Sequence, residues 1–358
     1  MAQDDFDEQW YLSSYPLAQK EIARGQAKDA RDHFVRRGRA RGYLPSPSAD
    51  RPNNAAAPLS RFGGLWTDQR NALDLLEGKL ELGMITAADA EKLRGFITDG
   101  YVIVENAVPE EILDAALSDL EKAYSGEDPQ QRFECLALGH QFTPWIPEVR
   151  DHPAKAVEVH LRSSAIRDTI FCPALSRMLG LIFERRAMAS QTLGYYRGSA
   201  QGAHQDSAYV SYSLNKNFAA SWVALEDAEA GAGELFYFPG SQDVPDFLYG
   251  GKYKNIFDAN RMCPGWSDSE VQKHVQSLPG EAAKLGCTER TFIPKRGDAL
   301  IWAADLVHGG KPISATRTRK SVVTHYCPVD IAPLYFERPG RSSKIERHSS
   351  GNYWTTFM

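Results

Sequence analysis

Gly202-Ala203-His204-Gln205-Asp206 is the stretch that constrains the fold most strongly. Residues two apart on a β-strand point to the same face, so His204 and Asp206 can reach one metal ion while Gln205 faces away. A further histidine follows in Val307-His308-Gly309-Gly310, and it must come from another strand. Two imidazoles and one carboxylate on one face of Fe(II) leave the opposite positions open for a co-substrate and O₂.

A His-x-Asp triplet alone is weak evidence in a chain with nine histidines. A second signal is the alternating, β-branched run Thr318-Arg319-Lys320-Ser321-Val322-Val323-Thr324-His325-Tyr326, which predicts a strand with Arg319 and Ser321 on one face. A guanidinium binds a carboxylate through two parallel hydrogen bonds, and a neighbouring hydroxyl can add a third. This pair therefore suits the distal carboxylate of a dicarboxylic acid. We expect His325, of the same parity, to be a structural histidine.

Together these segments resemble the phytanoyl-CoA dioxygenase family of Fe(II)- and 2-oxoglutarate-dependent oxygenases. The resemblance runs from about Ala90 to Asp330, and its other matching segments, in order, are Lys92 to Val104, Val108 to Ile112, Ser221 to Asp227 and Gly233 to Ser241. It implies that His204, Asp206 and His308 are the catalytic metal ligands and that Arg319, aided by Ser321, grips 2-oxoglutarate. The cofactors implied are Fe(II), 2-oxoglutarate as co-substrate, and O₂.

Two further contacts to the co-substrate are predicted. Trp222 matches a position where the family places an aromatic side chain beside 2-oxoglutarate, although a tryptophan in an apolar strand also fits the core. Gln191 precedes the metal strand, as do Tyr195 and Tyr196, and could line the pocket with polar groups. Simple cross-strand packing is the alternative for these residues.

The reaction implied by the resemblance is hydroxylation of an unactivated C–H bond, with release of succinate and CO₂. Epimerisation, desaturation and ring formation use the same ligands, so the sequence does not separate them. Asp206 disfavours halogenation, since related halogenases replace this carboxylate with a small residue. Gln242 stands where many relatives have histidine, which leaves that residue's role in substrate handling open.

Two alternatives belong to other classes of protein. A non-catalytic jelly-roll sensor or accessory domain could keep the metal and dicarboxylate pocket without turnover. A hydrolase or isomerase of the cupin kind, using Zn²⁺ or Mn²⁺, would need neither O₂ nor 2-oxoglutarate, but it leaves Arg319 unexplained.

Composition favours a soluble enzyme, and we expect its substrate to be a small molecule. The chain has 358 residues, 42% of them hydrophobic and 24% charged, and a net charge of −5, which argues against nucleic-acid binding. No apolar run reaches the length needed to span a membrane, and the N-terminal stretch, which begins Met1-Ala2-Gln3-Asp4-Asp5, does not have the basic-then-apolar pattern expected of a leader. An odd set of five cysteines without CxxC spacing indicates free thiols and a cytoplasmic location.

The expected fold is mainly β with flanking helices, a double-stranded β-helix of the jelly-roll, cupin-like kind. We expect a helical module over residues 1–43, a linker over 44–63, the oxygenase domain over 64–335 and a C-terminal tail over 336–358.

The module resembles a short helical module found beside bacterial glycosyltransferases and other cell-surface glycan enzymes. This favours a polar or saccharide-linked substrate, whereas the preferred role for the module itself is to dock on the oxygenase or on a partner copy in a homodimer. An insertion at about 243–290 could close over the substrate, with Lys252, Lys254 or Arg261 meeting an anionic group. A solvated surface loop is the alternative.

Overall fold

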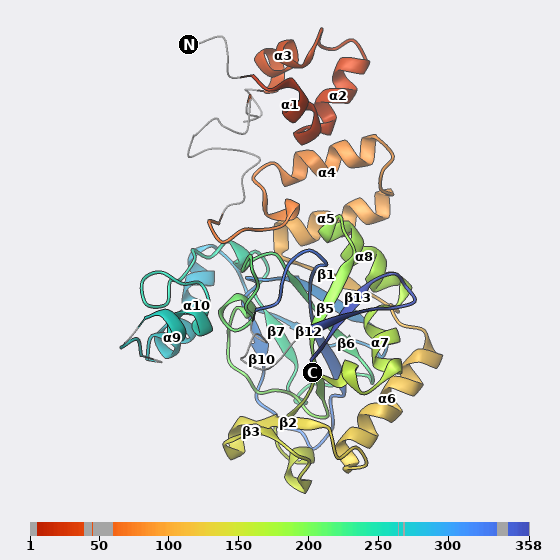
Figure 1. Ribbon diagram of the computed structural model, residues 1–358, viewed down its shortest axis with the longest axis vertical. Coiled ribbons are helices and arrows are strands. Elements are labelled where there is room, and N and C mark those ends of the chain that lie inside the picture. The colour runs from red at the N-terminus through yellow and green to blue at the C-terminus, as the bar shows by residue number, and fades with distance from the viewer. Residues whose placement is uncertain are drawn as a thin grey trace. The chain divides into compact units, whose positions relative to one another are not determined.

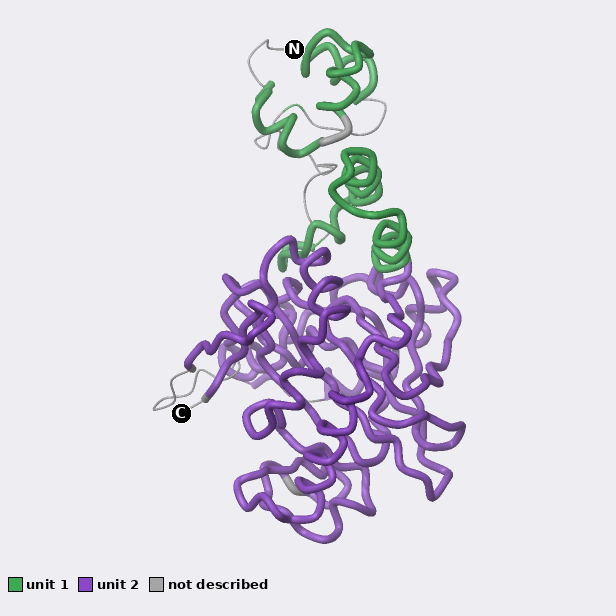
Figure 2. Tube along the Cα trace, turned by 90° about the vertical axis from the view of Figure 1, so that its right-hand side faces the viewer, with its two compact units in different colours: residues 1–98 green, residues 99–358 purple. Residues whose placement is uncertain are grey.

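The computed structural model describes residues 6–38, 45, 60–263, 265–267, 269–334 and 343–357. The chain divides into one unit of residues 1–98 and a second of residues 99–358 (Figure 2). The expected oxygenase domain began at residue 64, whereas residues 64–98 group here with the N-terminal module. Most of the predicted linker, residues 46–59 included, lies outside the described residues.

The first unit is helical. Its elements are α1 (Glu8–Ser14), α2 (Pro16–Ala23), α3 (Ala30–His33), a π-helical turn (Phe34–Gly38), a 3-10 turn (Trp66–Asp68), α4 (Ala72–Glu81) and α5 (Ala87–Asp99). A chain of buried polar groups holds the first three helices together: the Tyr11 hydroxyl lies 2.8 Å from Nδ1 of His33, and Nε2 of that ring lies 2.8 Å from Glu21. Helix α5 begins with the predicted capping box, since Thr86 and Asp89 each accept the other's backbone N–H.

The second unit contains two β-sheets (Figure 1). The larger has the order β1 (Tyr101–Val104), β9 (Ala299–Ala303), β6 (Ala219–Ala224), β11 (Ser321–Pro328), β5 (Ala187–Tyr195), β4 (Lys155–Val157), β2 (Arg132–Cys135) and β3 (His140–Thr143). The smaller has the order β10 (His308–Gly310), β7 (Leu235–Tyr237) and β8 (Arg290–Phe292). Apart from one parallel pair described below, neighbouring strands are antiparallel.

The core lies between these sheets. Trp222 and Trp302 of the larger sheet pack in one cluster with Leu235 and Phe292 of the smaller, and the rings of Trp222 and Phe292 meet edge to face at 5.8 Å. Helices α6 (Glu110–Ser125), α7 (Ser164–Ile170) and α8 (Pro173–Phe183) flank the sheets, and the Tyr326 hydroxyl donates to the Ile170 carbonyl at 3.0 Å. The predicted double-stranded β-helix with flanking helices is therefore confirmed.

Two strand predictions were wrong at their ends. Only His204 of the metal stretch makes a β-bridge, to His308, because the chain turns into a 3-10 helix over Asp206–Ala208. Strand β11 begins at Ser321, so Arg319 lies just before it. The expected insertion contains two helices, α9 (Ile256–Met262) and α10 (Ser269–Lys284), and α10 buries Leu278 and Ala282.

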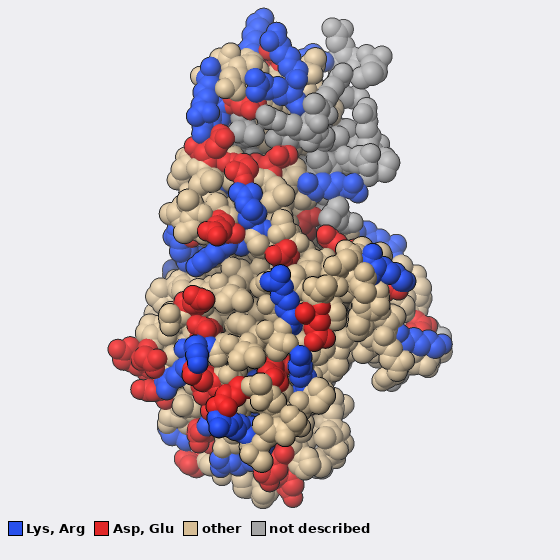
Figure 3. Space-filling view, turned by 180° about the vertical axis from the view of Figure 1, so that it is seen from behind, with Lys and Arg blue, Asp and Glu red and all other residues tan. Residues whose placement is uncertain are grey.

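Three further features are the absence of long apolar helices from the described residues, the state of the cysteines and the distribution of surface charge. Among the described residues, no helix is both long and apolar enough to cross a membrane. All five cysteines are free thiols, as predicted. On the face shown in Figure 3, Lys and Arg side chains lie intermixed with Asp and Glu.

The expected C-terminal tail contains a hairpin of β12 (Ser343–Arg347) and β13 (Tyr353–Phe357), and β13 adds in parallel to β5. Buried His160 connects β13 to β5. Its Nε2–H donates to the carbonyl of Thr355 in β13 at 3.0 Å, and its Nδ1 lies 2.7 Å from the hydroxyl of Thr192 in β5 and 3.3 Å from Glu158. Burial lowers the pKa of His160 to about 4 from 6.5. The ring is therefore neutral in the folded protein at neutral pH.

A neutral buried histidine makes stability depend on pH, because the unfolded chain takes up a proton below pH 6.5 while the folded chain does so only near pH 4. We expect the free energy of unfolding to fall across this window on acidification, with a contribution from His160 of at most about 1.4 kcal/mol per pH unit. His160→Gln keeps a donor for Thr355 and does not titrate. Urea unfolding at several pH values should give a shallower slope for this variant, and parallel curves would contradict the assignment.

Candidate metal centre

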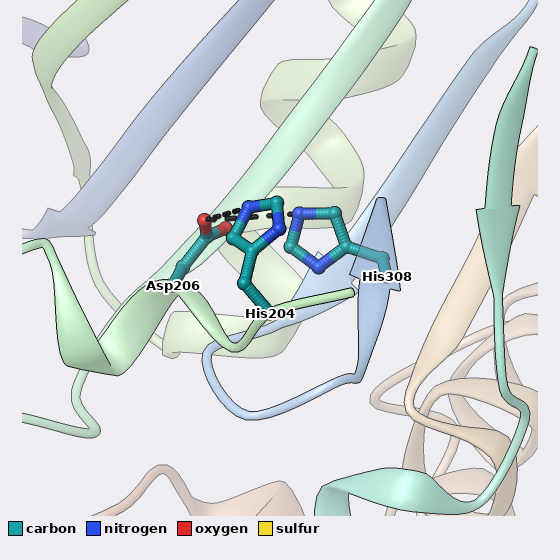
Figure 4. Close-up of side chains that lie close together, drawn as sticks. All are labelled: His204, Asp206 and His308. Atoms are coloured by element: carbon teal, nitrogen blue, oxygen red, sulfur yellow. Dashed lines mark ion pairs between the residues drawn. The ribbon is translucent and has the colours of Figure 1, made fainter. Parts of the chain in front are cut away.

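Three side chains converge between the two sheets (Figure 4): His204, Asp206 and His308 each place one ligand atom within 4.8 Å of the others. Oδ1 of Asp206 lies 3.7 Å from Nε2 of each histidine. Backbone hydrogen bonds of 2.8 and 3.0 Å pair His204 with His308, so their rings lie side by side with centroids 4.3 Å apart. The sequence prediction that these residues meet agrees with this geometry.

The local hydrogen bonds prepare both imidazoles as metal ligands. Nδ1 of His204 lies 2.9 Å from the Gly202 carbonyl, and Nδ1 of His308 lies 2.9 Å from the Leu306 carbonyl. A carbonyl only accepts, so each Nδ1 carries the proton and each Nε2 offers its lone pair toward Asp206. Burial and the neighbouring His308 lower the pKa of His204 to about 3. Burial raises the pKa of Asp206, but the facing histidines bring it below its usual value.

The second oxygen of Asp206 lies close to two residues that the sequence did not predict as site residues, and one of them donates a hydrogen bond to it. The indole N–H of Trp302 donates to Oδ2 at 2.9 Å, and Nε2 of His325 lies 3.4 Å from the same atom. We had expected His325 to be a structural histidine, whereas it lies beside the candidate metal centre. Its position two residues along the strand from Val323, with the parity of Arg319, was the available signal.

A second group of buried polar atoms has no protein partner. Nε and Nη1 of Arg319, Oγ of Ser321 and Nε1 of Trp222 lack hydrogen-bond partners among the described residues. Arg319 is 3% exposed, its guanidinium lies 5.2 Å from the centre of the Trp222 ring, and burial lowers its pKa only to about 10. Buried donors are almost always satisfied in native proteins, so this group fits a ligand that carries a carboxylate.

Strand register relates this carboxylate cradle, formed by Arg319, Ser321 and Trp222, to the candidate metal centre. His325 pairs with Gln191 of β5, and Ser321 pairs with Tyr195 of the same strand. Four residues of a strand span about 13 Å. Half-buried Gln191 therefore lies next to His325, at the level of the metal centre along the strands, and Tyr195 lies next to Ser321, at the level of the cradle.

Tyr196 was considered as a residue that lines the pocket, but its side chain contacts Arg150 and Tyr124. It accepts a hydrogen bond of 2.6 Å from Arg150, and its ring packs against Tyr124. Lys155, which the sequence did not single out, pairs with Tyr195 in the sheet and with Glu134 at 3.0 Å. Burial lowers the pKa of Lys155, but Tyr195, Glu134 and Asp206 raise it overall. A charged lysine thus lies within electrostatic reach of the metal centre.

Of the three insertion cations expected to meet a substrate anion, Lys254 is already paired inside the protein, while the role of Lys252 and Arg261 stays a prediction. Lys254 is 3% exposed and lies 2.8 Å from Asp246 and 3.2 Å from Asp305, so its charge is compensated inside the protein. Arg261 is exposed and lies 3.9 Å from Asp258, and Lys252 lies over the ring of Tyr253.

A double-stranded β-helix with a His-x-Asp and a distant His on facing strands is the arrangement of non-haem iron oxygenases. The family model described as Phytanoyl-CoA dioxygenase (PhyH) matches residues 96–321. The chain belongs to the phytanoyl-CoA dioxygenase family. This confirms the resemblance inferred from the sequence.

Solved structures agree with the fold. A complex of the epimerase SnoN with Fe³⁺, alpha ketoglutarate and nogalamycin RO is 17% identical, covers 75% of this chain and 98% of its own, and has a TM-score of 0.53. A second structure of SnoN, from nogalamycin biosynthesis, is 16% identical with the same coverage and a TM-score of 0.50. No curated protein sequence matches the chain. The iron and 2-oxoglutarate expected from the sequence are thus found together on this fold.

Trp302 and Trp222 offer a matched pair of substitutions, because both are 2% exposed but only Trp302 donates to Asp206. We expect Trp302→Phe to lower the affinity for Co(II) by about tenfold or more, as removal of a ligand's hydrogen-bond partner does. Trp222→Phe should leave metal affinity unchanged and weaken binding of 2-oxoglutarate. Anaerobic titrations would measure both, and equal loss of metal affinity in the two variants would contradict this division.

Proposed function

We propose that the protein is an Fe(II)- and 2-oxoglutarate-dependent dioxygenase that hydroxylates an unactivated C–H bond of a small polar or saccharide-linked metabolite. One observation carries the proposal: the carboxylate cradle holds buried polar atoms that lack hydrogen-bond partners among the described residues, on the same inner sheet face as the candidate metal centre. The metal ligands alone would also fit a cupin hydrolase or isomerase, and neither needs the cradle. A non-catalytic sensor or accessory domain would keep both groups, so turnover separates it from the enzyme.

In this proposal His204, Asp206 and His308 hold Fe(II), and the cradle holds the distal carboxylate of 2-oxoglutarate. Fe(II) held there would supply the oxidation by O₂ and 2-oxoglutarate, in which one oxygen atom enters the substrate C–H bond, the other enters succinate, and CO₂ is released. Arg319 keeps its charge at neutral pH because its pKa falls only to about 10. The guanidinium can therefore bind a dianionic acid throughout the neutral range.

The inner face also supports the proposal through what surrounds the ligands. Trp302, which packs in the core cluster with Leu300, donates to Asp206, and this ligand carboxylate is buried. The half-buried polar side chains on the same side are Gln191 and Lys155 with its partner Glu134, and they suit a polar substrate. A cytoplasmic location and a homodimer remain predictions from the sequence.

Lys320 provides a control for the cradle, because it neighbours Arg319 but pairs with Glu121 at 2.7 Å and Glu226 at 3.2 Å. We expect anaerobic Fe(II) with 2-oxoglutarate to give a visible charge-transfer band in the wild-type protein and none in His204→Ala. Arg319→Ala should need about 30-fold more 2-oxoglutarate, the loss of a charged hydrogen-bonded pair, while Lys320→Ala should titrate as wild type.

Succinate release in air tests turnover in the same samples. A protein that binds metal but gives neither the band nor succinate, and that is active without O₂, would be a cupin hydrolase or isomerase. A protein that gives the band but releases no succinate with any small-molecule pool would be a sensor or accessory domain.

A further inference from the structure

A buried charge cluster lies beside the candidate metal centre without including its ligands. Asp305 is 1% exposed and lies in the turn between β9 and β10. Its Oδ2 lies 2.7 Å from Nζ of Lys216 and 3.2 Å from Nζ of Lys254. Asp246 lies 2.8 Å from Lys254 and 3.7 Å from Lys216, so two carboxylates balance two lysines. Burial raises the pKa of Asp305, but the lysines lower it to about 2, and the carboxylate stays charged.

Asp305 is also bonded to both residues that flank the ligand Asp206. The Ser207 hydroxyl donates to Oδ1 of Asp305, and the Gln205 amide donates to the Asp305 carbonyl at 2.7 Å. The backbone N–H of Ser207 donates to the Ala304 carbonyl at 3.2 Å. From Asp305 the chain continues directly to His308. One residue therefore connects the two segments that carry the ligands.

The insertion also contacts Asp305 and the segment that carries Asp206. Lys254 forms an ion pair with Asp305, and the next residue, Asn255, donates from its side chain to the Ser207 carbonyl at 3.3 Å. Asn255 also caps α9 by accepting the N–H of Phe257 at 2.8 Å. An apolar cluster continues the contact: Ala208 and Tyr209 pack against insertion residues that include Tyr249, Ala259 and Trp266. The ring of Tyr209 lies 5.8 Å from that of His204.

We infer that Asp305 is a positioning residue that couples the insertion to the metal centre, through Lys254 on one side and Gln205 and Ser207 on the other. The inference rests on the proposed metal binding. Because coupling between two sites is reciprocal, metal binding should order the insertion, and an ordered insertion should hold the metal more tightly. The insertion then acts on the reaction through the ligand geometry as well as by covering the substrate.

Lys254 and Lys216 allow a matched test, because each contacts Asp305, but Lys254 belongs to the insertion, whereas Lys216 lies outside it and reaches it only through Asp246, at 3.7 Å. Replacing either with methionine removes one charge from the same cluster. Hydrogen–deuterium exchange of α10 would be measured in the full chain with and without Co(II), under saturation established by titration. We expect Co(II) to slow exchange about fivefold in the wild type and in Lys216→Met, and to have no effect on α10 in Lys254→Met.

A second variant tests the link to the ligands. Asp305→Asn should lower Co(II) affinity about tenfold, as loss of a partner outside the ligand set does. Equal slowing of exchange in Lys254→Met and the wild type would overturn the inference, as would Co(II) binding to the wild type without slowing of α10. If the wild type bound no Co(II), the proposed metal site itself would be wrong, and the inference with it.

Discussion

Two backbone hydrogen bonds between His204 and His308 are the constraint on which the candidate site depends. They join the segment after β5 to the first residue of β10, and so bring together side chains that are far apart in the sequence. The flanking turns complete the site around this bridge. The 3-10 turn brings Asp206 toward the two rings, and the carbonyls of Gly202 and Leu306 fix the ring orientations. A site of three ligands from two elements needs this kind of support, because a small displacement of either element separates the ligands.

Charge is distributed over this site in a consistent way. Buried carboxylates such as Asp206 and Asp305 face cations or N–H donors, whereas Arg319, Ser321 and Trp222 of the cradle keep polar atoms without a hydrogen-bond partner among the described residues. An uncompensated buried guanidinium is costly, so it is retained where a ligand supplies the missing acceptors. Buried polar groups with protein partners therefore belong to the scaffold of this sheet face, and those without such partners mark the binding site.

The sequence predicted the fold class and the residues of the triad because period-two alternation and motif spacing are local signals. His204 and Asp206 lie close together, as expected, although Asp206 begins a 3-10 turn, and Arg319 precedes β11 rather than lying on that strand. Trp302, His325 and Lys155 were missed as site residues because their roles follow from the register between distant strands. Asp305 was missed for a similar reason, since its partners come from three separate loops.

The parallel addition of β13 to β5 has a consequence for how the chain avoids self-association. Strand β4 covers β5 only from Leu193 to Tyr195, so the other half of that edge is paired at Met188 and Ala189 by the hairpin. An uncovered strand edge with apolar side chains is a template for pairing with another chain. Residues 343–357 thus cover part of the exposed edge of β5, the strand that carries Gln191. Loss of the hairpin would affect the solubility of the protein before it affected the ligands.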